Sequence, residues 1–80
     1  MSLERLDVSG LRCPMTWVRT KLAIERAAPG EWIEVVLGPG AMLDNVPRNA
    51  REDGHHVEGP APISPDRHLL RVRKRGAPPA

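Results

Sequence analysis

The stretch Gly-Leu-Arg-Cys-Pro at residues 10–14 decides the fold, because it joins a strand pattern to a helix pattern and holds the only cysteine. Proline is favourable at the first position of a helix, where an N–H would have no intrahelical partner and the fixed φ already suits the helix. We therefore predict a helix that begins at Pro14, with Cys13 as its N-cap residue. In that arrangement the N–H groups of Met15 and Thr16 point back toward the cysteine sulfur.

This placement favours a reactive thiol. The start of a helix carries roughly half a positive charge, and Arg12 adds a full charge beside Cys13. Thiols in such surroundings have a pKa lowered from about 8.5 to about 3.5–7.5, so we expect a thiolate nucleophile near neutral pH. The alternative is a structural cysteine that packs as a small buried apolar residue. The spacing alone leaves both interpretations open.

Length and composition limit the classes of function. Eighty residues with a net charge of +2 predict one small domain, which we place at residues 1–75 with a frayed tail at residues 76–80. A single cysteine forms no internal disulfide and supplies no structural zinc site, and the three histidines lack ligand spacing with it, so we predict neither metal nor cofactor. The lone cysteine, the lack of a signal pattern and the short apolar runs favour the cytoplasm.

Apolar periodicity and turn residues divide the chain into six elements. Alternation of apolar and polar residues indicates strands, and longer stretches with helical spacing that end at Gly or Pro indicate helices. The predicted strands are residues 4–8, 31–37, 55–58 and 67–74, and the predicted helices are residues 14–28 and 41–53. The order β-α-β-α-β-β predicts an α/β fold, an open two-layer sandwich in which two helices cover one face of a four-stranded mixed sheet.

Proline and glycine set the expected details of the second half. A proline in a helix interior costs about 3 kcal/mol. We therefore predict that the regular second helix begins with Asp44 or Asn45 as its N-cap, which places Pro47 in the first turn. Gly54 is the expected glycine after this helix. Residues 59–62, Gly-Pro-Ala-Pro, are predicted to form a loop.

The first helix and the sheet each have two faces to assign. One apolar stripe of the helix is predicted to cover the sheet, and the other either packs on the second helix or is exposed. The first stripe is Trp17, Thr20, Ile24, Ala27 and Ala28, and the second is Met15, Val18 and Leu22. The largely apolar strand at residues 31–37 is predicted to be central. The sheet face without helices would carry Trp32, Val36, Leu69 and charges, and is either partly wet or a docking surface.

Basic residues gather in two places. These are Arg19, Lys21 and Arg26 on the first helix, and Arg71, Arg73, Lys74 and Arg75 near the end. Such clusters are solvated faces, docking surfaces for an acidic protein, or contacts to nucleic acid. A chain with no Phe or Tyr and two Trp lacks the usual base-stacking residues, so nucleic-acid binding is the least favoured of the three.

The sequence also resembles a known family, the TusA/SirA-like sulfur-carrier proteins, over residues 6–74. The resemblance rests on Leu-Asp-Val-Ser-Gly-Leu-Arg-Cys-Pro at residues 6–14, Val18-Arg19, Lys21, Pro-Gly-Glu at residues 29–31, Asn-Val-Pro at residues 45–47 and Gly54-His55. The family motif is Cys-Pro-x-Pro, whereas this sequence has Cys-Pro-Met-Thr, with Thr16 in place of the second proline. Thr16 restores an N–H in the first helical turn and adds a hydroxyl group. Because the Gly-Pro-Gly segment at residues 38–40 lacks the acidic character of the tRNA-thiolation members, tRNA thiolation is not assigned.

The resemblance implies a sulfurtransferase-type carrier that relays sulfane sulfur as a persulfide on Cys13. The residues expected to support the thiol are Arg12, Pro14, Met15 and Thr16, and those expected to dock partners are Met15, Val18, Arg19 and Lys21. The implied partners are a sulfur donor of the cysteine desulfurase or rhodanese type and a thiol-bearing acceptor protein. Two other hypotheses remain: a non-catalytic interaction or regulatory module, and a nucleic-acid-binding domain.

Overall fold

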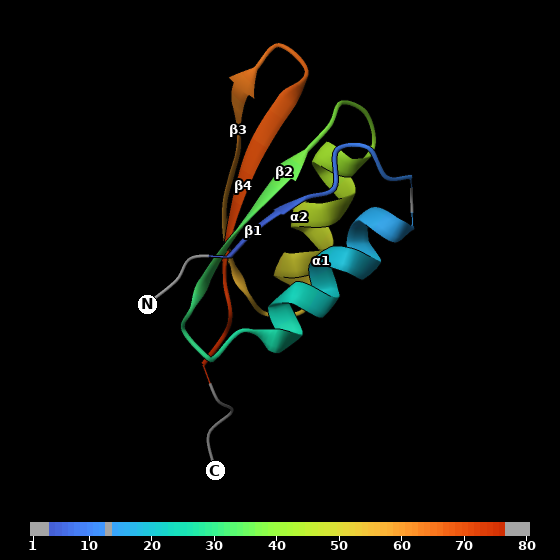
Figure 1. Cartoon of the computed structure of the whole chain (residues 1–80). Helices are drawn as coiled ribbons and strands as arrows, with labels where there is room; N and C mark the ends of the chain where they lie inside the picture. The colour runs from blue at the N-terminus through green and yellow to red at the C-terminus, as the bar shows by residue number, and fades with distance from the viewer. Residues whose placement is uncertain (1–3, 13, 77–80) are drawn as a thin grey trace.

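The computed structural model describes residues 4–12 and 14–76, so Cys13 and residues 77–80 of the predicted tail lie outside the described part of the chain. The described elements follow the predicted order β-α-β-α-β-β (Figure 1). They are β1 (Glu4–Asp7), α1 (Met15–Arg26), β2 (Trp32–Leu37), α2 (Met42–Glu52), β3 (His56–Ser64) and β4 (Arg67–Arg73). Neither of the helices in this part is long and apolar enough to cross a membrane.

The four strands form one mixed sheet in the order β1-β2-β4-β3. β1 runs parallel to β2, whereas β4 is antiparallel to both β2 and β3. Both helices cover the same face of the sheet, and no described element covers the other face (Figure 1). This confirms the predicted open two-layer α/β sandwich and the central position of the strand over Trp32–Leu37.

The core lies between the sheet and the helices. Alternate residues of β2 and β4 point into it, as the sequence pattern predicts, and are almost fully buried: Ile33, Val35, Leu37, Leu70 and Val72. From the helices the core receives Ala23, Ile24, Ala27, Val46 and Ala50. The predicted stripe of α1 is largely confirmed, with Thr20 and Ile24 buried. Trp17 packs against the core but stays partly exposed, and the prediction for Ala28 is wrong because α1 ends at Arg26 and Ala28 is exposed.

α2 begins earlier than predicted, which corrects the assignment of Asp44 or Asn45 as its N-cap. The N-cap is Ala41, and Pro47 lies inside the helix. Met42 and Leu43 are part of the first turn and pack against the core. Burial of Pro47 and partial burial of these two side chains offset the lost N–H of the proline, a tertiary effect that helix propensity omits. Gly54 follows the helix with φ +90°, as predicted.

β3 is longer than predicted and includes the segment that was expected to be a loop. It spans His56–Ser64, with irregular pairing between Glu58 and Ala61 and again between Pro62 and Ser64. Because β3 is at the edge of the sheet, Pro60 and Pro62 can lie in it without removing a hydrogen bond that a second neighbour needs. Gly59 has φ +98° at the first irregularity. The two prolines favoured a loop when judged locally, because the sequence pattern does not show that this strand lies at the edge of the sheet.

Candidate functional site

The chain reaches the site through a tightly bonded turn after β1. The Val8 N–H donates to the Val36 carbonyl at 3.0 Å, which continues the pairing with β2, and the Leu11 N–H donates to the Val8 carbonyl at 3.0 Å. The Asp7 carboxylate accepts hydrogen bonds from the Ser9 N–H at 2.9 Å and the Ser9 hydroxyl at 2.6 Å. These bonds lower the pKa of Asp7, which keeps the carboxylate charged. Hydrogen bonds therefore hold the segment between β1 and Arg12 in place.

Gly38, the residue after β2, packs closely against the backbone of this turn. A Cβ atom at Gly38 would lie 2.7 Å from the Ser9 carbonyl oxygen, closer than real Cβ contacts. Only glycine lets the two backbones approach in this way. The local sequence pattern indicates only the end of a strand at Gly38, because a contact between residues this far apart in the chain leaves no local signal.

α1 begins one residue later than predicted. Its N-cap is Pro14, with φ −91° and ψ 3°, and Met15 is the first helical residue. The Met15 N–H donates to the Arg12 carbonyl at 2.7 Å, and the Thr16 N–H donates to the same oxygen at 3.3 Å. The prediction that these two N–H groups point toward the cysteine sulfur concerns Cys13, which lies outside the described residues. The Arg12 carbonyl thus accepts hydrogen bonds from the first N–H donors of the helix.

The electrostatic surroundings of this segment are positive. The first turn of α1 contains no acidic residue, so nothing within it offsets the positive end of the helix dipole. Arg12 and Pro14, the two described neighbours of Cys13, are both exposed. Arg12 and Pro14 thus lie at the surface, at the positive end of α1.

Thr16 takes a different position from the other residues of the motif. Only 1% of its surface is exposed, and its carbonyl accepts a hydrogen bond from the Thr20 hydroxyl at 2.7 Å. Its N–H is used by the Arg12 carbonyl. The threonine that stands in place of the family's second proline is therefore a buried residue that ties α1 to the preceding turn.

The predicted docking residues divide between two surfaces. Met15, Val18 and Leu22 are 43%, 39% and 48% exposed, so this apolar stripe faces solvent and does not pack against α2. Arg19 is also exposed, and its helical position places it beside the stripe. Lys21 lies apart from them, because it lines a groove on the other side of α1.

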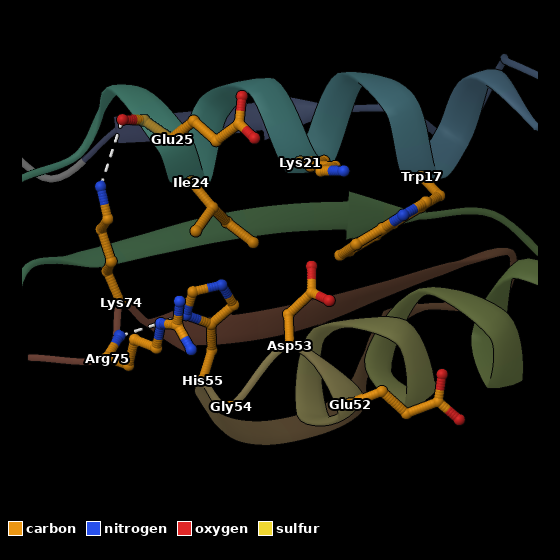
Figure 2. Close-up of a pocket in the computed structure, with 10 residues that line it drawn as sticks. All are labelled: Trp17, Lys21, Ile24, Glu25, Glu52, Asp53, Gly54, His55, Lys74 and Arg75. Atoms are coloured by element: carbon orange, nitrogen blue, oxygen red, sulfur yellow. Dashed lines mark hydrogen bonds between the residues drawn. The ribbon is translucent and has the colours of Figure 1, made fainter. Parts of the chain in front are cut away.

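That groove lies between α1 and the end of α2 and has a volume of about 470 Å³ (Figure 2). Trp17, Lys21 and Ile24 line it from α1, and Asp53 and His55 line it from the opposite side. The groove is closed toward the end of α1, where the Lys74 ammonium donates to the carbonyls of Glu25 and Ala27. Lys21 was predicted to dock partners, but the sequence pattern did not indicate a groove here.

His55 is the titratable group of the groove with a perturbed pKa. Its Nδ1 accepts a hydrogen bond from the Arg75 N–H at 3.1 Å. Burial lowers the pKa of His55, and the charges of Arg75 and Lys74 lower it further, whereas Asp53 opposes them.

Within residues 4–12 and 14–76, no group of three or more metal-ligating side chains is placed to hold an ion.

The fold is shared with a solved SirA-like protein. The crystal structure of a SirA-like protein from Desulfitobacterium hafniense superposes with a TM-score of 0.76, covering 91% of this chain and 99% of that one at 19% identity. The family model for sulfurtransferase TusA matches residues 4–74, and the chain belongs to this family.

Two curated relatives are similar over most of their length. One from Archaeoglobus fulgidus is 29% identical over 72 residues, which is 90% of this chain and 82% of the relative. One from Methanocaldococcus jannaschii is 37% identical over 57 residues, which is 71% of this chain and 76% of the relative. Both are named as candidate sulfur carrier proteins.

Proposed function

We propose that this protein carries sulfane sulfur as a persulfide on Cys13 and passes it between partner proteins. Its membership of the TusA family, whose relatives are named as candidate sulfur carriers, is the observation that carries the proposal. The exposed neighbours Arg12 and Pro14 and the positive start of α1 support it. A single thiol is sufficient, because the sulfur moves from one protein to the next and needs no resolving cysteine.

Each transfer is a thiol–disulfide type exchange that requires no oxidant. The Cys13 thiolate attacks the outer sulfur of a donor persulfide; the S–S bond of the donor breaks, and the donor thiolate leaves. The acceptor thiolate then attacks the outer sulfur of the Cys13 persulfide, and the Cys13 thiolate leaves. Because the group is first the attacking and then the leaving thiolate, a lowered thiol pKa favours both steps.

Arg12 and the start of α1 are proposed to stabilise the Cys13 thiolate by charge rather than by direct N–H bonds. The N–H groups of Met15 and Thr16 already donate to the Arg12 carbonyl, so they contribute through the helix dipole. The proposed roles of Pro14 and Thr16 are to begin the helix at a fixed angle and to tie it to the core. A cysteine desulfurase or a rhodanese-type protein is the proposed donor, a thiol-bearing protein the acceptor, and the reducing cytoplasm the proposed compartment.

The intact mass of the protein tests the carrier role. After incubation with a cysteine desulfurase and cysteine, we expect a gain of one sulfur atom that a reductant removes. The gain is expected to be absent in Cys13→Ser, which replaces the only cysteine of the chain. If no sulfur is gained from the desulfurase, nor from thiosulfate with a rhodanese, the carrier role is wrong and the interaction module becomes the better hypothesis.

The exposed stripe of α1 is proposed to dock the donor and the acceptor. Leu22→Glu is expected to slow persulfide uptake from the donor protein while leaving alkylation of Cys13 by iodoacetamide unchanged. Ile63→Glu is a matched control, because Ile63 is 52% exposed and lies in β3, away from α1. Equal slowing by both variants would contradict docking at the stripe.

A further inference from the structure

The sheet face opposite the helices carries an ordered row of charges. Arg5, Glu34, Arg71 and Glu58 are in register across the four strands, so the row alternates positive, negative, positive and negative. Arg5 donates to Glu34 at 2.9 Å, and Arg71 lies 3.8 Å from the other oxygen of Glu34. At the two ends, the side chains of Arg5 and Glu58 are 61% and 51% exposed. The row therefore ends in accessible charges of opposite sign.

We propose that this face binds a second copy of the chain about a two-fold axis that runs parallel to the strands. Rotation about such an axis exchanges the positions of β1 and β3 and those of β2 and β4. The row of charges in one copy therefore lies against the same row of the other copy in reversed order. Arg5 of each copy lies opposite Glu58 of the other copy, and Glu34 lies opposite Arg71.

The neighbouring rows fit the same rotation. The registered pair Trp32 and Arg73 exchange places, so that Trp32 of each copy lies opposite Arg73 of the other. Val36 and Leu69 are paired in the same way, but Val36 is only 6% exposed, so the half-buried Leu69 supplies most of the apolar surface of this row. A two-fold axis perpendicular to the strands and centred on the charged row would instead place like charges against each other. The charge pattern therefore selects a single orientation, in which strands of the two sheets run in similar directions.

A second copy suits this face better than a nucleic acid does. The Trp32 ring already contacts the guanidinium groups of Arg71 and Arg73, at 5.0 and 5.8 Å, and the His56 ring at 5.7 Å. Glu34 and Glu58 in the adjoining row repel a polyanion. A base therefore finds neither a free aromatic ring nor a uniformly positive surface.

The face sets the expected strength of association. Strands about 4.8 Å apart and rows of side chains about 6.8 Å apart give a patch of roughly 400 Å² on each copy, which is at the small end for protein interfaces. The dimer is therefore weak and depends on concentration and salt. Because α1 lies on the opposite layer, its N-terminal segment and its exposed stripe stay accessible in both copies (Figure 1).

Charge reversal at the ends of the row tests the proposal. Sedimentation equilibrium of the full chain in the Cys13→Ser background, from about 10 μM to about 1 mM, is expected to show an average mass that rises toward twice 8.8 kDa. Arg5→Glu alone places two glutamates opposite each other, and Glu58→Arg alone places two arginines opposite each other. Each single variant is expected to associate at least tenfold more weakly. Arg51→Glu, an exposed charge reversal on α2, is the control that should associate as the parent does.

Mixing the two single variants gives the decisive result. In the mixed pair, every arginine of the row again faces a glutamate, so we expect association to return to the level of the parent. Circular dichroism of each variant confirms that it is folded. A parent that stays monomeric throughout the range overturns the proposal, and so does a dimer that neither variant weakens or that the mixture fails to restore. Binding of single-stranded RNA by the parent that Glu58→Arg strengthens would assign the face to nucleic acid instead.

Discussion

The two faces of the sheet use alternate residues of the same strands in opposite ways. On β4, Leu70 and Val72 point to the helices and are fully buried, whereas Arg71 and Arg73 point to the open face and are exposed. The closed face joins apolar side chains from four strands and two helices into one core. The open face pairs charges across strands, in contacts that water screens. The buried face therefore contributes most of the stability, whereas the open face contributes exposed charges that can contact other molecules.

The strongest test of this contrast is Leu70→Ala. Leu70 has no exposed surface and lies in the centre of the core, so its truncation leaves a cavity. We expect the free energy of unfolding to fall by about 2–5 kcal/mol, measured by urea denaturation. In a chain of 80 residues this is a large part of the total stability. A loss below about 1 kcal/mol would show that the closed face does not dominate stability.

Gly38→Ala tests whether close backbone packing at the end of β2 matters as much as the core side chains. The added Cβ would lie 2.7 Å from the Ser9 carbonyl, so the turn before Arg12 must shift. We expect a loss of roughly 1–3 kcal/mol in the same denaturation experiment. Gly10→Ala is the control, since a Cβ there meets nothing within 4 Å and Gly10 does not require a positive φ. Equal effects of the two substitutions would contradict the role of the Ser9 contact.

Arg71→Ala, next to Leu70 in the chain, measures the open face directly. It removes a guanidinium that lies 5.0 Å from the Trp32 ring centre and 3.8 Å from Glu34. An exposed pair of this kind contributes about 0.5–1 kcal/mol, so we expect a loss several times smaller than for Leu70→Ala. Arg71→Lys keeps the charge and is expected to retain only part of the contribution. A loss as large as that of Leu70→Ala would remove the distinction between the faces.

The same contrast explains what the sequence could predict. Alternation in residues 31–37 and 67–74 reports burial on one face, so the sheet, its central strand and most of the core were predicted correctly. The errors lie where distant contacts override local preference. Pro47 stays inside α2 because Met42 and Leu43 pack, half-buried, against the core, and Pro60 and Pro62 stay in β3 because it is an edge strand.

The site shows a similar division. The helix after the cysteine follows from the motif itself. The sequence does not predict that the Arg12 carbonyl accepts the hydrogen bonds of Met15 and Thr16, since a shift of one residue at a helix start leaves the sequence pattern unchanged. The sequence does not predict the Gly38–Ser9 contact either, because that contact depends on the packing of two chain segments.

The smallest expected effect is a pH-dependent one at Asp7, on the open side of β1. Its pKa is lowered in the folded protein by the hydrogen bonds from Ser9, so the ionised carboxylate stabilises the fold. A lowered folded-state pKa means that this contribution is fully present above the unfolded-state pKa of 3.8 and is lost as the pH falls through the folded-state value. Asp7→Ala is therefore expected to lower the melting temperature slightly at pH 7, and the difference from the parent should shrink below about pH 4. Thermal melts of both proteins across this range cancel the effects of the other carboxylates, which the two share. A difference that stays constant with pH would show that Asp7 acts through its shape and not through its charge.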